Sequence, residues 1–171
     1  MTTPRAPFNV LFLCTANSAR SIMAEALLRR WGQDRFRALS AGSQPAVAVH
    51  PRTLALLSRC NHDITGLHAK SWDVFAAPGA PQLDFVFTVC DRAAGETCPV
   101  WPGQPITAHW GVDDPVAVEG SDSVIEKAFR DAYLVLEARI KLFTALRIEA
   151  LDRYSLRRRL EEIGQSHDSA A

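Results

Sequence analysis

The sequence has no excess of positive or of negative charge. Its 171 residues include 19 basic and 19 acidic side chains, so the formal net charge at pH 7 is zero with histidine neutral. Proteins that bind nucleic acid or an anionic membrane as their main task carry a basic excess or a basic patch. We therefore expect neither nucleic acid nor a membrane as a partner.

Long apolar runs are also lacking. No stretch approaches the roughly 20 apolar residues that a membrane-spanning helix needs. The N-terminal run that ends at Leu13 is too short for a secretory signal, and bulky Leu13 precedes Cys14 where a cleavage site would need small residues. We expect a cytoplasmic protein. Since a reducing compartment disfavours permanent disulfides, we expect reactive or buried thiols at Cys14, Cys60, Cys90 and Cys98.

The spacing typical of a zinc site is missing. No Cys-x2-Cys or His-x3-His pair occurs. The residue types that zinc prefers are present but scattered: Cys60, His62, His68, Cys90, Cys98 and His109. Because spacing rather than residue type marks a structural zinc site, we predict no structural zinc.

What the sequence does contain is an alternation of strand and helix patterns. Apolar runs typical of buried strands occupy residues 8–13, 36–40, 84–89 and 106–110. Helical spacing occupies residues 19–30, 51–60, 121–147 and 151–163, with a short helix expected over 70–76. This order predicts an α/β three-layer sandwich, in which helices cover both faces of a four-stranded parallel sheet.

The length of the chain suits one compact domain. We expect a core of about residues 8–147, then a helical extension and tail of about residues 148–171, with the tail after Gly164 disordered. The extension contains three consecutive arginines, Arg157–Arg159. We interpret them as a solvated helix face, because Leu156 and Leu160 recur on the opposite side.

The loop after the first expected strand has the form of an anion-binding site. Cys14 is followed by Thr15, Ala16, Asn17, Ser18, Ala19, Arg20 and Ser21. Backbone N–H groups at a helix N-terminus, together with the helix dipole, favour a tetrahedral oxyanion. Arg20 adds a planar fork for two oxygens. We therefore assign Thr15–Ser21 to oxyanion binding and Cys14 to nucleophilic attack.

The backbone N–H groups and the helix dipole that favour the oxyanion should also favour a thiolate at Cys14. This effect predicts a pKa of the Cys14 thiol well below the ordinary value. We expect the Ser21 hydroxyl to donate a hydrogen bond to the thiolate, and the side-chain amide of Asn17 to brace the loop. A buried cysteine followed by an unrelated surface arginine is the plainer interpretation of this spacing.

Several segments resemble the low-molecular-weight protein tyrosine phosphatase superfamily. They are Val10–Ser21, Met23-Ala24-Glu25, Ser40-Ala41-Gly42 and Asp113-Asp114-Pro115. The resemblance implies a doubly wound fold with a four-stranded parallel sheet. It also implies that Asp114, which precedes the proline, is the general acid, with Asp113 as the second choice. A helix cap or turn is the alternative interpretation of this aspartate pair.

Two further cysteines bear on the reaction. A phosphatase needs a thiolate, an arginine and an acid, and it has no use for more thiols. Here Cys90 ends the third expected strand and Cys98 follows eight residues later, which suits a thiol relay. With His109-Trp110-Gly111, and with Val116 and Ala117 where phosphatases carry tyrosines, the sequence is similar to the arsenate reductases of the superfamily.

That resemblance implies reduction of arsenate to arsenite. Cys14 attacks arsenate, Cys90 displaces arsenite to form Cys14–Cys90, and Cys98 then forms Cys90–Cys98 for thioredoxin to reduce. No cofactor is bound in this scheme. Because the interval from Cys90 to Cys98 is one residue longer than in the best-known thioredoxin-coupled members, glutaredoxin with glutathione stays open as the external reductant.

Two other activities stay open on the sequence. One is a low-molecular-weight phosphatase that hydrolyses phosphate monoesters through a phosphocysteine at Cys14. The other is a catalytically silent oxyanion or redox sensor. Cys60 is interpreted as a core residue in each case.

Some reductases of this family bind potassium beside the anion loop. Their Asn, Glu and Ser ligands match Asn17, Glu25 and Ser40, and Lys70 aligns with the acidic fourth ligand. At this departure from the family pattern we expect the Lys70 ammonium to replace the ion and stabilise the loop, so we predict no required metal.

Overall fold

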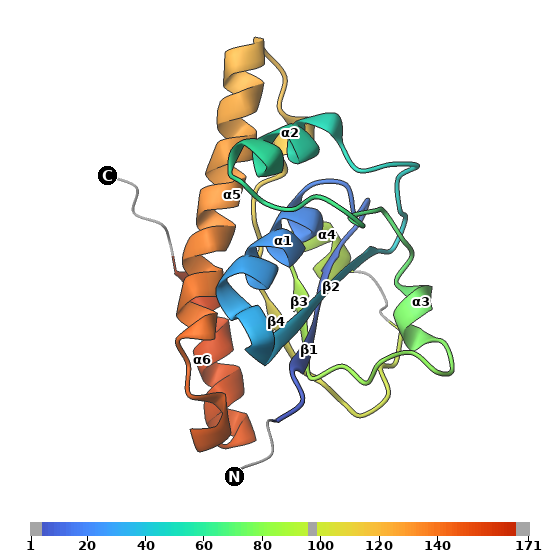
Figure 1. Ribbon diagram of the computed structural model, residues 1–171, viewed down its shortest axis with the longest axis vertical. Coiled ribbons are helices and arrows are strands. Elements are labelled where there is room, and N and C mark those ends of the chain that lie inside the picture. Colours follow the sequence, from blue (N-terminus) through green and yellow to red (C-terminus); the bar gives the residue numbers. More distant parts are fainter. Residues whose placement is uncertain (1–4, 96–98, 167–171) are drawn as a thin grey trace.

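The computed structural model describes residues 5–95 and 99–166. Its four strands are β1 (Phe8–Cys14), β2 (Phe36–Gly42), β3 (Phe85–Thr88) and β4 (Ile106–His109). They pair in parallel in the order β2-β1-β3-β4 (Figure 1). The expected parallel four-stranded sheet is therefore confirmed. All four carboxyl ends meet at one edge, where ligand sites of such sheets form.

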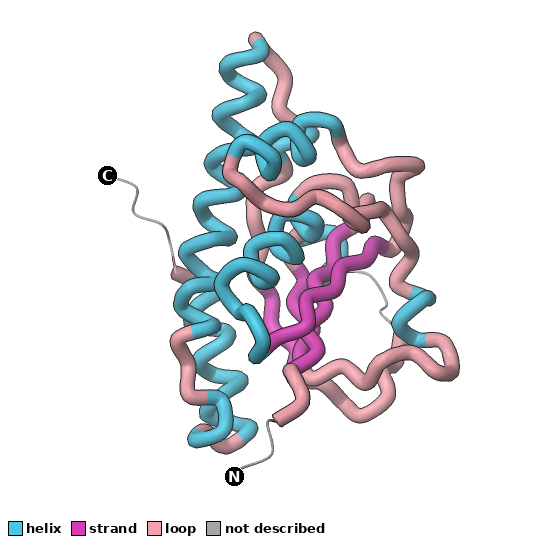
Figure 2. The backbone as a smooth tube through the Cα atoms, viewed as in Figure 1, coloured by secondary structure: helices cyan, strands magenta, loops and turns pink. Residues whose placement is uncertain are grey.

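The helices follow the strands in the expected alternation (Figure 2). They are α1 (Arg20–Gly32), α2 (Pro51–Arg59), α3 (Asp73–Ala76), α4 (Asp91–Ala94), α5 (Asp122–Thr144) and α6 (Arg153–Gln165). Short 3-10 turns occupy Gln33–Arg35, Pro115–Ala117 and Ile148–Ala150. No helix of the described ranges is long and apolar enough to cross a bilayer.

The two faces of the sheet bury different sides of each strand. Along β1, Val10 and Phe12 belong to the larger core, with α1, α5 and α6, whereas Leu11 and Leu13 belong to a smaller one. This alternation follows from the two-residue period of a strand. The smaller core is completed by residues around α3 and the loops, including Phe75. Helices thus cover both faces, as predicted, but unequally.

Aromatic rings fill the larger core. The rings of Phe87 and Trp110 stack at 4.0 Å between centroids, and Phe143 of α5 meets both edge-on. Trp110 is fully buried directly after β4. The end of β4 is thereby fixed just before the chain turns toward the carboxyl edge.

The C-terminal extension packs onto β4. The indole N–H of Trp110 donates to the carbonyl oxygen of Leu160 at 2.9 Å, and Leu156, Leu160 and Ile163 are buried. A Cβ at Gly164 would collide with the carbonyl oxygen of His109, so glycine lets α6 approach the strand closely. The opposite face of α6 carries the i,i+4 pairs Arg157–Glu161 and Arg158–Glu162, at 3.3 and 3.5 Å. This agrees with the solvated face that we expected.

Two local expectations are wrong. Residues 91–94, expected as part of a loop, form α4. Four residues are too few for a hydrophobic period to reveal a helix. Trp31 continues the apolar spacing of the helix expected over residues 19–30, which predicts a buried ring, but it is 41% exposed and lies under the Lys141 ammonium, 4.4 Å from its ring centroid. Its ring lies against α5 instead, where the indole N–H donates to Glu137 at 3.4 Å.

Candidate active site

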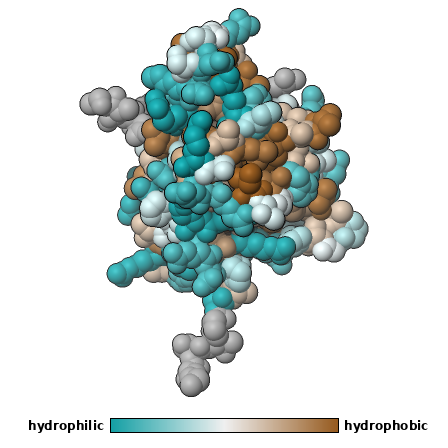
Figure 3. Space-filling view, turned by 45° about the horizontal axis from the view of Figure 1, so that its top comes forward, coloured by the Kyte–Doolittle hydropathy of each residue, from teal (hydrophilic) through white to brown (hydrophobic). Residues whose placement is uncertain are grey.

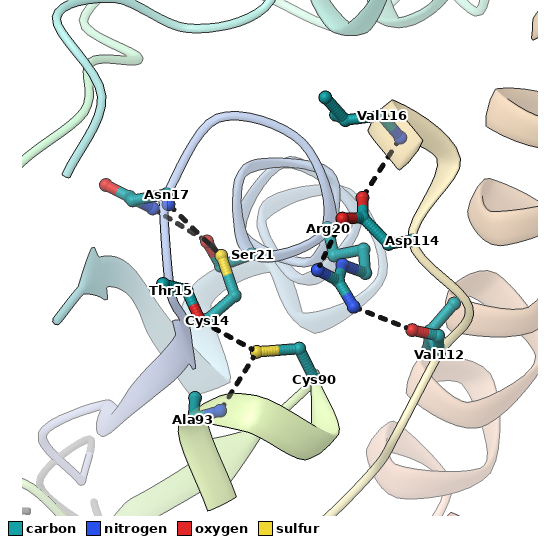
Figure 4. Close-up of polar contacts among 10 residues, drawn as sticks. All are labelled: Cys14, Thr15, Asn17, Arg20, Ser21, Cys90, Ala93, Val112, Asp114 and Val116. Carbon is teal, nitrogen blue, oxygen red and sulfur yellow. Dashed lines mark hydrogen bonds and ion pairs between the residues drawn. The ribbon is translucent and has the colours of Figure 1, made fainter. Parts of the chain in front are cut away.

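A cavity of about 420 Å³ opens at the carboxyl edge of the sheet. It is lined by Cys14, Thr15, Ala16, Ser18, Ala19, Arg20, Cys90, Asp91, Val112, Asp113, Asp114 and Val116. Four of the predicted catalytic residues, Cys14, Arg20, Cys90 and Asp114, therefore face one space, although they come from three parts of the chain (Figure 4). Asn17 and Ser21 are buried beside the cavity. Cys98 lies outside the described residues.

The anion loop is held from behind by the segment after β2. Backbone N–H groups of Ser43 and Gln44 donate to the carbonyl oxygens of Cys14 and Thr15, at 3.2 and 2.9 Å. A Cβ at Gly42 would collide with the carbonyl oxygen of Thr15, so only glycine allows this approach. The carbonyls of the loop are thus directed away from the cavity, which suits an anion site.

Asn17 organises the hydrogen bonds beneath the loop. The backbone N–H of Lys70 donates to its Oδ1 at 3.0 Å, which fixes the orientation of the amide, because a backbone N–H can only donate. The amide nitrogen then donates to the hydroxyl oxygens of Ser21, at 2.7 Å, and Ser40, at 3.1 Å. Since Ser21 accepts from Asn17, its own proton is free for Cys14, whose sulfur lies 2.8 Å away.

The predicted lowering of the pKa of Cys14 is wrong for this structure. Burial raises the pKa of the Cys14 thiol, and this effect exceeds the lowering by hydrogen bonds from Ser21 and from the backbone N–H of Asn17. The fields of the loop and the helix favour the thiolate, but the loss of water around a 3% exposed cysteine disfavours it by more. Ser21 therefore stabilises the thiolate against a larger opposing effect.

Arg20 faces the loop that carries the aspartates. Its Nη1 donates to the carbonyl oxygen of Val112 at 2.9 Å, and its Nη2 lies 3.4 Å from Oδ2 of Asp114. Asp114 also accepts the backbone N–H of Val116 at 3.0 Å, which caps the turn at Pro115. Asp114 is therefore a cap of the turn Pro115–Ala117, as the alternative interpretation has it, and it also lines the cavity beside Arg20.

Cys90 has its own hydrogen-bond donors. Its sulfur accepts the backbone N–H of Ala93 at 3.3 Å, which caps α4, and lies 3.6 Å from Oγ1 of Thr15. Cys90 is 1% exposed, and its charge contributes to raising the pKa of Cys14. The two thiols are therefore close enough to influence each other.

The residues aligned with a potassium site form an internal network. Ser40 donates to the buried carboxylate of Glu25 at 3.2 Å, and Arg29 lies 3.2 Å from the other oxygen. Burial raises the pKa of Glu25, while Arg29 and Lys70 lower it. The ammonium of Lys70 donates to the carbonyl oxygen of His68 at 2.8 Å. The direct cationic partner of Glu25 is thus Arg29, and Lys70 acts on the carboxylate at longer range.

No metal cluster is formed by the part of the chain that the structure describes. Within it, no three His, Cys, Asp or Glu side chains gather as metal ligands. Cys60 lies at the end of α2 and packs against the larger core, in agreement with its interpretation as a core residue.

The structure adds one residue and one contact to the site expected from the sequence. Asp91 lines the cavity directly after Cys90, and Thr15 reaches Cys90. No sequence pattern indicated either, because both depend on how α4 is placed against the anion loop. Two exposed apolar side chains, Val47 and Val116, also lie at the carboxyl edge of the sheet, in the segments that follow β2 and β4. Figure 3 shows apolar surface gathered near the centre of that view.

A comparison with protein families identifies the family to which this fold belongs. The family described as low molecular weight phosphotyrosine protein phosphatase matches residues 9–155. The chain belongs to this family. The match begins in β1 and ends in α6, so it includes the anion loop, Cys90 and the aspartate loop of this phosphatase-family protein.

Within the phosphatase family, the chain is similar to arsenate reductases. It is 34% identical over 134 residues to the arsenate reductase of Halalkalibacterium halodurans, which covers 78% of this chain and 93% of the relative. A solved arsenate reductase in the phosphate binding state aligns with a TM-score of 0.62 at 26% identity, over 81% of this chain and 97% of the other.

A thioredoxin-dependent member is also similar. The enzyme from Corynebacterium glutamicum aligns with a TM-score of 0.54 at 26% identity, over 82% of this chain and 65% of the other. The expected resemblance to arsenate reductases of the low-molecular-weight phosphatase family is therefore confirmed.

Proposed function

We propose that this protein reduces arsenate to arsenite by a cysteine relay that begins at Cys14. The observation that carries the proposal is that Cys14 and Cys90 line the same cavity with Arg20 and Asp114. A second buried thiol, with hydrogen-bond donors of its own, has no use in ester hydrolysis. The similarity to arsenate reductases supports the same conclusion.

In the first step, the sulfur of Cys14 attacks the arsenic atom of arsenate in the loop. A sulfur–arsenic bond forms and an arsenic–oxygen bond breaks. The oxygen leaves as water, which takes up the thiol proton, and Asp114 assists as the general acid. Arg20 and the N–H groups of Thr15–Ser21 hold the remaining oxygens. The thiolate that develops accepts the hydrogen bond from Ser21.

In the second step, the sulfur of Cys90 attacks the sulfur of Cys14. The Cys14–Cys90 disulfide forms, and the electron pair of the sulfur–arsenic bond stays on arsenic, which is reduced from As(V) to As(III) and leaves as arsenite. Two thiols lose two electrons and arsenic gains them. Thr15 and the backbone N–H of Ala93 stabilise the Cys90 thiolate as it attacks.

In the last step, Cys98 attacks Cys90, which frees Cys14 and transfers the disulfide to Cys90–Cys98. An external dithiol then supplies two electrons and restores all the thiols. Thioredoxin is the proposed reductant, because a thioredoxin-dependent relative shares the fold, and glutaredoxin with glutathione is the alternative. Reductants of this kind act in a reducing compartment, so the proposal includes a cytoplasmic location.

One assay tests the proposal against hydrolysis. NADPH consumption is followed with arsenate, thioredoxin and thioredoxin reductase, beside the hydrolysis of an aryl phosphate. We expect arsenate-dependent turnover that Cys14→Ser, Cys90→Ser and Cys98→Ser each abolish. Turnover only with glutaredoxin and glutathione would retain the reaction and change the reductant.

A low-molecular-weight phosphatase is the second candidate. It is favoured by one observation, that Cys14, Arg20 and Asp114 suffice for a phosphocysteine pathway and lie around one cavity. Aryl phosphate hydrolysis that survives Cys90→Ser, without any arsenate turnover, would favour it and contradict the reductase.

A further inference from the structure

A hydrogen-bonded chain of side chains connects β3 and β4 to α4. Oγ1 of Thr88, at the end of β3, lies 2.7 Å from Nδ1 of His109. Nε2 of His109 lies 2.7 Å from Oδ1 of Asp91, the first residue of α4. Both ring nitrogens of His109 are therefore engaged, which fixes the orientation of the ring.

The backbone is shaped around this contact. A Cβ at Gly111 would lie 2.6 Å from Oδ1 of Asp91 and 2.8 Å from Nε2 of His109, so a side chain there would displace the pair. On the other side, Gly164 of α6 lies directly against the carbonyl oxygen of His109. Two glycines thus make room for His109 and for the carboxylate that it holds.

Asp91 lines two cavities, which also share Val112, Asp113 and Asp114. Asp91 lines the cavity that contains Cys14 and Cys90, while Asp91 and His109 both line a second cavity of about 660 Å³ between β4, α5 and the end of α6. His109 itself does not line the first cavity. Any effect of His109 on the thiols is therefore indirect, through its contacts with Asp91 of α4 and with Thr88, which lies two residues before Cys90.

The helix that His109 holds needs such support. An isolated helix of four residues is not stable in water, because the first turn fixes several residues for one hydrogen bond. The described contacts that place α4 include its cap at the sulfur of Cys90, the buried Ala93, and the bond from Asp91 to His109. Only the last of these ties α4 to β4.

From this arrangement we propose that His109 is a positioning residue for Cys90, acting through Asp91 to hold α4 so that the second thiol faces Cys14. The inference rests on the relay proposed above, in which Cys90 must reach the sulfur of Cys14. The carboxylate of Asp91 is 93% exposed, so the bond is weak and can be released during turnover.

The test measures how fast the Cys14–Cys90 disulfide forms in a single turnover with arsenate, in a Cys98→Ser background where this disulfide accumulates. Because an exposed pair contributes little, we expect His109→Ala to slow the step by about fivefold. His109→Gln keeps an N–H donor for Asp91 and should stay close to the parent rate. Asp131→Ala, which removes a carboxylate from the second cavity but not from α4, is the matched control.

A double-mutant cycle separates positioning from general packing. If His109 acts through Asp91, then Asp91→Ala, His109→Ala and the double variant should all slow the step equally. Protection of Cys14 from alkylation by inorganic phosphate should be unchanged in His109→Ala. An unchanged rate in His109→Ala, a further slowing when it is added to Asp91→Ala, or a loss of phosphate protection would each overturn the inference.

A second arm does not depend on arsenate. Diamide takes two electrons and two protons from Cys14 and Cys90 as their disulfide forms, so it reports on thiol placement alone. Slower diamide oxidation in His109→Ala supports the inference even if the parent protein fails to reduce arsenate, in which case only the proposed function fails. Equal diamide rates in a parent protein that does turn over arsenate would overturn the inference alone.

Discussion

The hydroxyl oxygen of Ser21 lies 2.8 Å from the sulfur of Cys14, and the amide of Asn17 directs the hydroxyl proton toward that sulfur. This hydrogen bond lowers the pKa of Cys14, while burial raises it by more. The reactivity of Cys14 therefore depends on a balance between a specific contact and the loss of solvent.

Removing the Ser21 hydroxyl should shift that balance. Ser21→Ala removes the hydroxyl whose hydrogen bond lowers the pKa of Cys14, so this pKa should rise further. Alkylation by iodoacetamide should then need a higher pH than in the unaltered protein. The backbone N–H of Ser21, which also lowers the pKa, remains. Ser43→Ala is the control, because the buried Ser43 hydroxyl has no hydrogen-bond partner in the described structure. An unchanged or lower pH midpoint would contradict the account.

Asn17 combines a backbone role with a side-chain role, and two variants separate them. Its φ is 49°, a left-handed conformation that glycine and asparagine tolerate better than alanine. Both Asn17→Gly and Asn17→Ala lose the hydrogen bonds to Ser21, Ser40 and Lys70, which should cost about 1–3 kcal/mol.

The alanine variant adds backbone strain. We expect Asn17→Ala to be less stable than Asn17→Gly by about 1 kcal/mol in chemical denaturation. If the two variants are equally stable, the left-handed conformation is not required. If Asn17→Gly is as stable as the unaltered protein, the hydrogen bonds of the Asn17 side chain do not stabilise the fold.

The carboxylate of Glu25 has cationic neighbours within the chain, Arg29 and Lys70. We therefore expect arsenate turnover to be nearly the same in potassium and in sodium at equal ionic strength. Lys70→Ala removes one of the two cations and should make turnover more sensitive to potassium. A sharp rise in the activity of the unaltered protein with added potassium would contradict this prediction.

The close contact between Gly164 and β4 predicts how the C-terminal extension contributes to stability. Gly164→Ala places a Cβ against the carbonyl oxygen of His109, so α6 must shift, at a cost of about 1–3 kcal/mol in the free energy of unfolding. Glu161→Ala, on the exposed face of the same helix, should change it by less than about 0.5 kcal/mol. Equal effects of the two substitutions would show that α6 is not docked on β4.

Much of the fold was predictable because its evidence is local. The apolar run of β1 followed by Cys14 and the helical spacing of α1 placed the anion loop at the carboxyl edge, and the structure has both. The length of α5 was overestimated by three residues at its end, where Ala145 no longer continues the helix. α4 was missed because its four residues carry no period, and its placement depends on contacts with His109 and Cys90.

The site was predictable in its members but not in its energetics. Cys14, Arg20, Cys90 and Asp114 were named from spacing and resemblance, and they line one cavity. The direction of the pKa shift at Cys14 could not be obtained in this way, because desolvation depends on how completely neighbouring segments enclose the sulfur. The direct pairing of Glu25 with Arg29 rather than Lys70 likewise depends on side-chain positions.

The central claim is that Cys14 and Cys90 together supply the two electrons that reduce arsenate. The most direct measurement mixes the fully reduced protein with arsenate in the absence of any external thiol and quantifies arsenite and disulfides after acid quenching. In Cys98→Ser, we predict one arsenite for each chain and one disulfide, between Cys14 and Cys90, with neither product when Cys90→Ser is added. Arsenite formed in full without Cys90, or no arsenite from the unaltered protein, would contradict the relay.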